Sequence, residues 1–443
     1  MRSRLPILAM AALSLASATA ENNSVQTERP AEVTLRPNPN GDWRFFVDGR
    51  EFPVHGAGGA GAPGLLEKLK EAGGNCVRTW GSDALEARMS NGDRFIDRAH
   101  QLGLMVVPGL WVQHERHGFD YSDPAFITRQ RTQLLAQVRA YRNHPAVLAW
   151  GLGNEMEGPS SPTGSVVVLQ EVEELAKLIK QEDPHHPVMT VIAFTGGGKV
   201  ANLVQYCPSI DVLGLNTYGA AAGAGSAIKA AGWTKPFAIT EFGVNGFWEV
   251  GKTDWGAPYE PTSQEKGRSF YAAHRMVFEL NDGKELCVGT FAFLWGWKQE
   301  KTDTWFGMFL PTLEKLAPVD AMTKVWTGHW PTNRCPVLNA LNSPAAAKQI
   351  PPGQEFPATV EVEDPDGDTL VYDWLVKSES TAQSVGGEAE YVPASHPDLI
   401  TGGANATTRF RSPVQPGNYR LFVTVRDRRG GAATANFPFQ VGP

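Results

Sequence analysis

The chain has 443 residues, of which 20% are charged, and its net charge of −7 is spread over interspersed acidic and basic positions. This pattern disfavours a nucleic-acid-binding protein, which would need a basic stripe. The length fits one large domain with a small one, or three small domains. The 13 Trp and 21 Phe could stack on sugar rings, although most aromatic side chains simply fill cores.

The N-terminus has the three parts of a secretory signal peptide: a basic start, an apolar run over 5–15 and the small-residue pattern ATA at 18–20. The apolar run is too short to span a bilayer, and no later stretch approaches the roughly 18 apolar residues of a membrane helix. We therefore expect residues 1–20 to be removed before Glu21 and the mature protein to be secreted or periplasmic, without a membrane partner.

Four cysteines lie far apart in the sequence: Cys76, Cys207, Cys287 and Cys335. An exported protein could pair them in three ways, and the sequence does not choose among these pairings. None of them belongs to a C-x-x-C motif, so a zinc site is not expected. Cys76 falls in a predicted strand, where it would pack as a small apolar residue.

A polar, proline-containing segment over 21–42 is expected to be a loose lead-in, followed by a hairpin over 43–52 with Asp48-Gly49 as its tight turn. Short apolar runs then alternate with helical patterns, as repeated βα units do. The predicted strands cover 53–56, 75–80, 104–112, 147–155, 188–193, 211–218, 237–242 and 289–297. Among the predicted helices are 64–72, 123–143 and 164–182.

Eight βα units over roughly 280 residues have the size of a closed barrel. The sequence therefore predicts an α/β protein with a (β/α)₈ TIM barrel over 43–328. The competing interpretation is an open doubly wound sheet, because 55–61 is rich in glycine. No acidic residue follows at the spacing of a dinucleotide-binding motif, which favours the barrel.

The composition changes near residue 328, where prolines interrupt a stretch without helical periodicity. We expect a linker over 329–345 and a small all-β sandwich over 346–443, since short alternating strand patterns follow with no helices. The segment 364–368 (DPDGD) is acidic enough to suggest calcium. Its spacing is not that of a full calcium loop, so an ordinary Asp/Gly turn is favoured.

Two glutamates stand where a barrel places its chemistry, at the carboxyl ends of strands. Glu155 follows Asn154 at the end of the fourth predicted strand, and Glu241 precedes Phe242-Gly243 at the end of the seventh. Two such carboxyls, about 5–5.5 Å apart, are what retaining glycoside hydrolysis requires: one protonates the leaving oxygen and the other attacks the anomeric carbon. Taken singly, each glutamate would more often be an ordinary surface residue.

These positions resemble the clan A glycoside hydrolases. The resemblance implies Glu155 as acid/base and Glu241 as nucleophile, with Asn154 binding the sugar. It further implies that Arg78 braces the nucleophile, that Tyr218 hydrogen-bonds it and that Trp295 forms the aromatic floor of the sugar subsite. His114 matches a position where the clan often has a sugar-contacting histidine.

The barrel is most similar to the catalytic domain of glycoside hydrolase family 2, and the tail resembles Ig-like or cadherin-like modules of secreted polysaccharide-degrading enzymes. The expected function is a retaining β-glycosidase acting on a β-linked glycan, of β-glucan type, with no cofactor and no metal. The alternatives are a transglycosylase with the same residues and a non-catalytic glycan-binding protein. The second is disfavoured because it would need neither glutamate.

Other polar and aromatic residues near these sites have alternative interpretations. Glu157 could replace Glu155 as the acid, but it lacks the strand-end position. His114 and His117 flank Glu115 at a spacing unsuited to a metal triad, so a polar loop beside a sugar cleft is favoured. The aromatic loop over 245–261 is either a sugar platform or a packed lid, since loops over barrel mouths often carry function.

Overall fold

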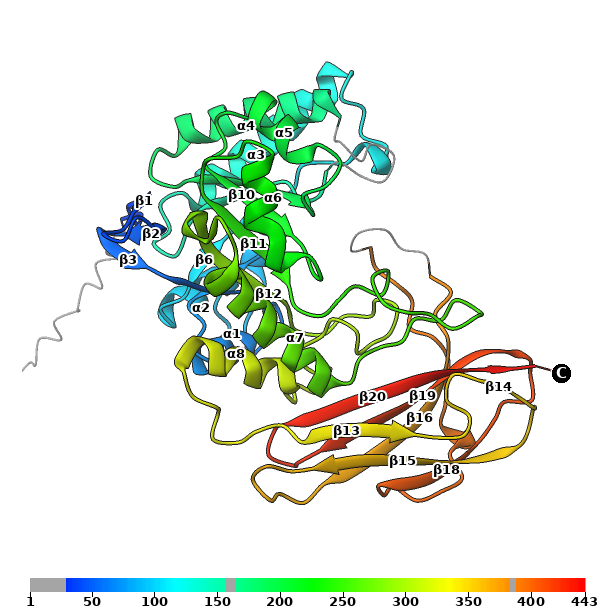
Figure 1. Ribbon diagram of the computed structural model, residues 1–443. Helices are drawn as coiled ribbons and strands as arrows, with labels where there is room; N and C mark the ends of the chain where they lie inside the picture. The colour runs from blue at the N-terminus through cyan, green and yellow to red at the C-terminus, as the bar shows by residue number, and fades with distance from the viewer. Residues whose placement is uncertain (1–28, 157–164, 383–387, 443) are drawn as a thin grey trace, which may run out of the picture.

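The computed structural model describes residues 29–156, 165–382 and 388–442. The signal peptide predicted over 1–20 and the candidate Glu157 therefore lie outside the described residues. The chain forms an α/β barrel, coloured blue to yellow in Figure 1, and a β-sandwich beside it, coloured yellow to red. The predicted fold class, a TIM barrel followed by a small all-β sandwich, is confirmed.

A small antiparallel sheet precedes the barrel, in the order β1-β2-β3. Its strands are β1 (Val33–Pro37), β2 (Trp43–Val47) and β3 (Arg50–Phe52). The turn between β2 and β3 is the predicted one, with positive φ at Asp48 (48°) and Gly49 (77°), as a tight hairpin turn requires. The lead-in is not entirely loose, because β1 pairs with β2 along its full length. Phe45 packs with the first residues of several barrel strands, so the sheet covers the amino-terminal end of the barrel.

The barrel sheet is parallel throughout, in the order β6-β5-β4-β12-β11-β10-β9-β8-β7. Its two edge strands, β6 and β7, are successive pieces of one predicted strand, interrupted by Pro108, which has no N–H to donate. The sheet therefore closes into a barrel of eight strands, in which β6 and β7 together count as one. The strands are β4 (Val54–Gly59), β5 (Cys76–Arg78), β6 (Met105–Val107), β7 (Gly109–Leu110), β8 (Trp150–Leu152), β9 (Val188–Ala193), β10 (Val212–Asn216), β11 (Phe237–Phe242) and β12 (Cys287–Trp295).

Helices surround this sheet and bury their apolar sides against it. The α-helices are α1 (Leu65–Glu71), α2 (Phe95–Gln101), α3 (Pro124–Tyr141), α4 (Val166–Glu182), α5 (Lys199–Tyr206), α6 (Ala224–Ala230), α7 (Ser263–Arg275) and α8 (Ala317–Thr327). Shorter helical turns are η1 (Ser82–Glu86), η2 (Glu115–His117), η3 (Ala221–Gly223), η4 (Met276–Leu280), η5 (Lys284–Leu286) and η6 (Pro397–Leu399). Asp123 caps α3, and Thr262 with Glu265 forms a reciprocal capping box on α7.

The sandwich consists of two sheets, ordered β13-β15-β18 and β14-β20-β19-β16-β17. Their strands are β13 (Val337–Asn342), β14 (Gln349–Ile350), β15 (Glu355–Glu363), β16 (Val371–Ser378), β17 (Ser395–His396), β18 (Thr407–Arg411), β19 (Gly417–Arg426) and β20 (Ala432–Val441). Alternate residues of these strands meet in one apolar core. β13 lies inside the segment 329–345 that was predicted as a linker, because it pairs with β15 as an edge strand.

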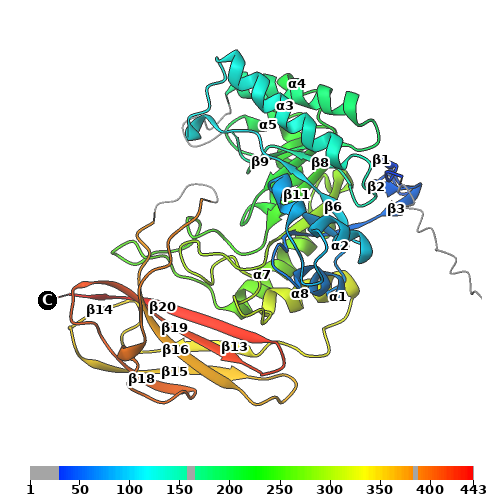
Figure 2. The ribbon, with the colours of Figure 1, turned by 180° about the vertical axis from the view of Figure 1, so that it is seen from behind.

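The sandwich packs against the loops at the carboxyl end of the barrel, with α7 next to β20 in both ribbon views (Figure 1, Figure 2). Arg420 of β19 is 1% exposed and donates to the backbone oxygen of Pro258 at 2.7 Å. The backbone N–H of Thr434 donates to the Ser263 hydroxyl at 2.9 Å. Buried polar contacts of this kind hold the two domains in one arrangement.

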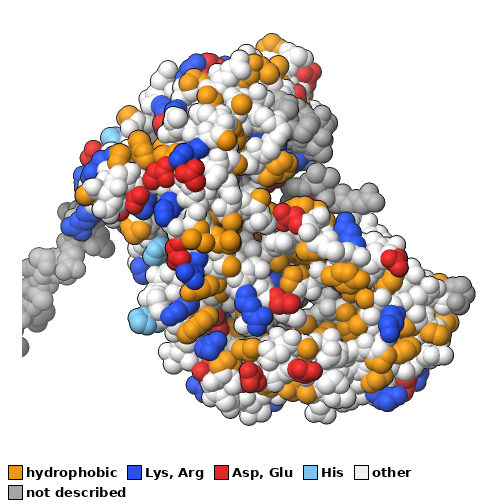
Figure 3. Space-filling model, viewed as in Figure 1, with side chains coloured by type: hydrophobic (Ala, Val, Ile, Leu, Met, Phe, Trp, Pro, Cys, Tyr) orange, Lys and Arg blue, Asp and Glu red, His pale blue; other side chains and the backbone are white. Residues whose placement is uncertain are grey.

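The structure also shows how the charged residues and the cysteines are distributed. Basic and acidic side chains are interspersed on the face drawn in Figure 3. All four cysteines are buried and free, so none of the three pairings is formed. Within the described ranges, no helix combines the length and apolar character needed to cross a bilayer.

Candidate active site

Strand ends bring the predicted residues together at one end of the barrel. Arg78 closes β5, Asn154 and Glu155 follow β8, Asn216 closes β10 and Glu241 lies in β11. All these strands are parallel, so their carboxyl ends form the same rim, where barrel active sites are built. The site is therefore assembled from backbone positions that the closed sheet itself fixes.

Glu241 is the most heavily supported carboxylate at this rim. Its Oε1 accepts hydrogen bonds from Arg78 Nη1 at 3.1 Å and from the Trp80 indole Nε1 at 2.8 Å. Its Oε2 accepts one from the Tyr218 hydroxyl at 2.7 Å. The Glu241 side chain remains 7% exposed. Three donors all stabilise the carboxylate form, and they leave Oε2 with more free lone-pair capacity than Oε1.

Two of these donors keep their protons for a physical reason. Burial lowers the pKa of the Arg78 guanidinium, and the charge of Glu241 opposes that shift. An arginine so paired stays charged. Burial raises the pKa of Tyr218 well above its ordinary value, and the negative charges of Glu241 and Glu155 raise it further. Tyr218 is therefore a neutral hydroxyl donor at any physiological pH.

Glu155 is held by a different kind of partner. Its Oε1 accepts a hydrogen bond from the Asn216 amide at 2.7 Å. The residue has a left-handed backbone (φ 49°), and its N–H donates to Val191 O at 2.9 Å. Left-handed backbone is costly for a non-glycine residue and collects at functional sites.

Asn154 links the two glutamates. Its Oδ1 accepts from Arg78 Nη2 at 2.6 Å and from Asn216 Nδ2 at 3.1 Å. The same Asn216 amide donates to Glu155. A continuous path of hydrogen bonds thus runs from Glu241 through Arg78, Asn154 and Asn216 to Glu155, so each carboxyl is positioned relative to the other.

Of the expected sugar contacts, Trp295 is wrong, and His114 stays a prediction. Trp295 has no exposed surface: its indole N–H donates to Leu65 O at 3.0 Å, and its ring packs on Phe309 and Trp326 in the core. It therefore cannot be the floor of a subsite. His114 is also without exposed surface, stacked between Trp111 and His117.

The aromatic ring of β12 that does lie near Glu241 is Phe293. Its ring meets Trp80 edge to face at 5.7 Å and Tyr218 at 5.9 Å, and both of those residues donate to Glu241. Phe293 lies two positions before Trp295 on the same strand. Trp295 packs toward α1 and α8, whereas Phe293 packs toward the site, so the predicted strand was right but the residue chosen on it was wrong.

Two residues of the site were not singled out from the sequence. Trp80 lies just beyond β5, where an aromatic residue is more often a core residue, and its contact with Glu241 spans 161 positions. Asn216 was named only as the residue before Tyr218. A polar amide at a strand end of a barrel is the signal that could have identified it.

The aromatic loop after β11 divides into exposed and packed parts. Trp248 is 52% exposed, and its ring meets Tyr218 edge to face at 5.8 Å, so it lies beside the site. Phe247 packs against Trp305, which is fully buried. Of the two interpretations, sugar platform and lid, the exposed ring of Trp248 supports the first for that residue.

No metal is implied at this rim. Within the part of the chain that the structure describes, the only His/Cys/Asp/Glu group with metal-ligand spacing is Asp364, Asp368 and Asp427, in the sandwich. Asp364 Oδ1 accepts the backbone N–H groups of Asp366 and Asp368, as in an ordinary Asx turn.

Comparison with known proteins places the barrel. Residues 95–254, which include both glutamates, match the family model "Glycosyl hydrolases family 2, TIM barrel domain". This part of the barrel is similar to the family 2 TIM barrel domain. The chain is 28% identical over 167 residues to a β-glucuronidase of Bacteroides fragilis, a match that covers 33% of this chain and 22% of that protein. It is 27% identical over 137 residues to β-mannosidase A of Aspergillus clavatus, covering 28% of this chain and 14% of that protein.

Among solved structures, the crystal structure of a Bacteroides uniformis β-glucuronidase superposes on 93% of this chain and 48% of its own, with a TM-score of 0.48 and 13% identity. The matches to the curated relatives thus span less than a quarter of those proteins. The family 2-like barrel is what this chain shares with them.

Proposed function

We propose that this protein is a retaining β-glycosidase in which Glu241 is the nucleophile and Glu155 the acid/base. One observation carries the proposal: Glu241 accepts hydrogen bonds from three donors and is connected through Arg78, Asn154 and Asn216 to Glu155, a second carboxyl at the same rim. Retaining hydrolysis needs two carboxyls held in fixed positions relative to each other, one as nucleophile and one as acid/base.

The first step forms a covalent bond between Glu241 and the sugar. Oε2, which has one donor rather than two, attacks the anomeric carbon, and the glycosidic bond to the leaving oxygen breaks. Glu155 gives its proton to that oxygen. The charge of Glu241 is consumed in the new ester, so the electrostatic penalty on ionising Glu155 falls as the bond forms.

The second step returns the site to its starting state. The Glu155 carboxylate takes a proton from a water molecule, the resulting hydroxide attacks the anomeric carbon, and the ester bond to Glu241 breaks. Arg78, Trp80 and Tyr218 stabilise the released carboxylate. Two inversions give net retention of the β configuration.

The proposed substrate is a β-linked poly- or oligosaccharide, with β-glucans first in order. Arg78 is occupied by Glu241 and Asn154, so it is not available to bind a substrate carboxylate. The exposed ring of Trp248 beside Tyr218 fits the apolar face of a neutral sugar. β-Glucuronides and β-mannosides belong in the same panel, because relatives are named for acting on them.

The test is a screen of β-glucans, mannans and aryl β-glycosides, followed by proton NMR of the first product formed from the best substrate. We expect the β anomer to appear first and to mutarotate later. An α anomer as first product would exclude the double displacement. Failure of the protein to cleave any β-glycoside in the panel would exclude the activity. Transfer to an added acceptor sugar instead of water would show a transglycosylase.

We also propose that the protein is exported and processed. The support is the sequence pattern over 1–20 alone. Intact mass of the exported protein should correspond to a chain beginning at Glu21. A mature form that retains residues 1–20 would contradict the proposal.

A further inference from the structure

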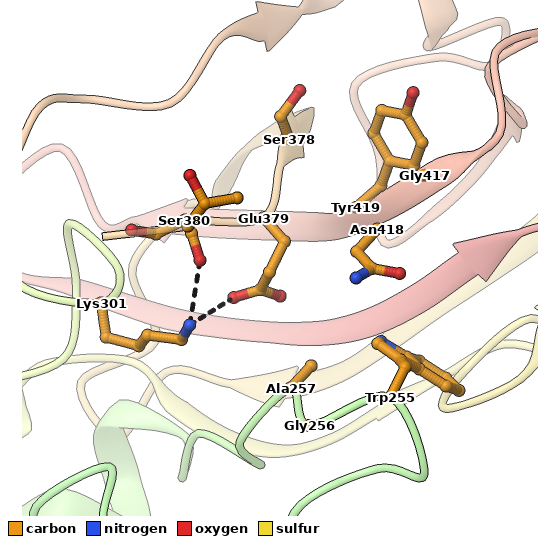
Figure 4. Close-up of a pocket in the computed structure, with 11 residues that line it drawn as sticks. Trp255, Gly256, Ala257, Lys301, Ser378, Glu379, Ser380, Gly417, Asn418 and Tyr419 are labelled. Carbon is orange, nitrogen blue, oxygen red and sulfur yellow. Dashed lines mark hydrogen bonds and ion pairs between the residues drawn. The ribbon is translucent and has the colours of Figure 1, made fainter. Parts of the chain in front are cut away.

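A cavity of about 320 Å³ lies between the two domains, away from the catalytic glutamates. The barrel contributes Trp255, Ala257 and Lys301, and the sandwich contributes residues 378–381 and 417–419 (Figure 4). The volume is at the lower end of the range for small-ligand sites, suitable for a single sugar ring. Neither domain alone would form this cavity, so it depends on their fixed arrangement.

The buried atoms of the wall that have no hydrogen-bond partner among the described residues are Trp255 Nε1 and the two Glu379 oxygens, and Glu379 has Lys301 and Arg420 as ion-pair partners. The indole Nε1 of Trp255 is enclosed and has no hydrogen-bond partner among the described residues. Figure 4 shows the nitrogen edge of the indole turned toward the space that it shares with Asn418 and Glu379. A buried N–H without an acceptor is costly, and native proteins seldom leave one. A ligand oxygen in the cavity would satisfy it.

The other polar groups in and behind the wall are held in place. Lys301 Nζ donates to Ser380 O at 3.0 Å and lies 3.7 Å from the Glu379 carboxylate. Arg420, behind Glu379, pairs with it at 2.7 Å. The Lys301 backbone N–H donates to Glu390 at 2.8 Å. Both cations thus pair with Glu379, and Glu390 lies against the Lys301 backbone. The two positive and two negative charges balance, which favours an uncharged ligand over a phosphate or a uronic acid.

Both barrel loops that reach the cavity also border the catalytic rim. The loop that carries Trp255 begins directly after β11, the strand of Glu241. Lys301 follows Glu300, whose pKa is raised by burial and, in smaller part, by the charges of Glu241 and Glu390. Glu300 and Lys301 lie on the loop after β12, the strand that pairs with β11, so this loop also starts at the catalytic rim.

We propose that this interdomain cavity is a remote subsite that binds one neutral sugar unit of the glycan, with Trp255 Nε1 and the Asn418 amide hydrogen-bonding its hydroxyl groups. This inference rests on the proposed function for the class of ligand. It gives the sandwich a direct part in substrate binding, because Asn418 and Ser380 belong to that domain.

The test compares long and short substrates on the full-length protein. Trp255→Phe keeps the ring and removes the N–H, and Ala257→Leu fills the cavity. We expect KM for β-linked gluco- or manno-oligosaccharides to rise about fivefold in Trp255→Phe, as for one lost hydrogen bond. The rise should be at least about tenfold in Ala257→Leu, where the whole sugar unit is displaced. An aryl monosaccharide β-glycoside is too short to reach the cavity, so its kcat/KM should stay unchanged.

Trp330→Phe is the matched control, since Trp330 is an exposed indole (46%) outside the cavity. Thermal unfolding of each variant verifies that the domains remain docked. If wild type cleaves the aryl glycoside and the oligosaccharides, yet both variants match Trp330→Phe on the oligosaccharides, the subsite is refuted and the proposed function stands. If wild type cleaves no β-glycoside, the proposed function fails first. Equal losses on long and short substrates would also refute the subsite, because they would place Trp255 in the catalytic site.

Discussion

Glu241 and Glu260 stand at the two ends of the loop after β11, both buried and both paired with a cation, yet their surroundings differ. Glu260 is 1% exposed and accepts four hydrogen bonds, two on each oxygen, from Lys266, Thr304, Thr302 and Asn436. Glu241 is 7% exposed and accepts three, with one on Oε2. The comparison separates a carboxylate whose capacity is filled by the fold from one that keeps capacity for a substrate.

The largest expected effect comes from replacing each of these two glutamates by glutamine, in separate variants. Glu241→Gln should lower kcat/KM by at least about 10⁴-fold with little change in stability, because no other group is placed to form the covalent bond. Glu260→Gln should do the reverse: it leaves Lys266 as a buried unpaired charge and costs about 3 kcal/mol of unfolding free energy. Activity assays and denaturant unfolding of both variants show whether each substitution lowers mainly activity or mainly stability. If both lose mainly stability, the assignment of Glu241 is wrong.

The second effect depends on the leaving group. With an aryl glycoside of good leaving group, Glu155→Gln should still form the intermediate but hydrolyse it about 10²-fold or more slowly, since only the second step then needs a base. Azide needs no base, so it should restore turnover and give a β-glycosyl azide. An α-azide would mean that the roles of Glu155 and Glu241 are exchanged.

A third, smaller effect concerns the donors to Glu241. Tyr218→Phe removes one hydrogen bond to a charged oxygen, worth about 1.5–3 kcal/mol, and should lower kcat/KM by about 10–100-fold. Because the pKa of Tyr218 is raised well above its ordinary value, the alkaline limb of the pH–rate profile should be the same in the variant. Tyr259→Phe is the control, since Tyr259 is an exposed tyrosine on the loop after β11. A shifted alkaline limb would show that Tyr218 itself titrates.

The smallest expected effect is a change in how the stability of the protein depends on pH, through Glu260. Burial would raise the pKa of Glu260, but Lys266 and its hydroxyl donors hold it below the ordinary value of 4.5. As pH falls, Glu260 therefore takes up its proton in the unfolded chain before it does so in the folded protein. Its ionised form contributes its full stabilisation above about pH 4.5, and this contribution is lost as pH falls through the pKa of the folded state. Glu260→Gln should flatten the loss of stability below about pH 4.5. If the free energy of unfolding of Glu260→Gln falls as steeply in acid as that of wild type, the ion pair between Glu260 and Lys266 is not stabilising.

Much of the barrel could be predicted because buried parallel strands are short apolar runs. β9 and β11 have the predicted bounds, since both are mostly apolar runs that begin directly after a proline, Pro187 and Pro236. Shorter strands were overextended, as in β8, which keeps three of nine predicted residues. β13 was taken for linker because its apolar alternation is weak and prolines flank it.

The two glutamates could be identified because strand ends and chemistry coincide there. Trp295 and Phe293 could not be distinguished, because the register of β12 breaks between Ala292 and Trp295, and simple alternation along the sequence does not show which of the two rings then faces the site. The domain interface was equally hidden: Arg420 and Pro258 are 162 positions apart, and no local pattern relates them.

The central claim is that Glu241 is the residue that becomes covalently bonded to the sugar. The direct measurement is mass spectrometry of a proteolytic digest after inactivation with an activated fluorosugar of the preferred substrate, which slows hydrolysis of the intermediate. The label should be on Glu241, should be absent from Glu241→Gln and should be lost slowly as activity returns. A label on Glu155 or Glu300, or an unlabelled enzyme that turns the fluorosugar over with inversion, would contradict the account.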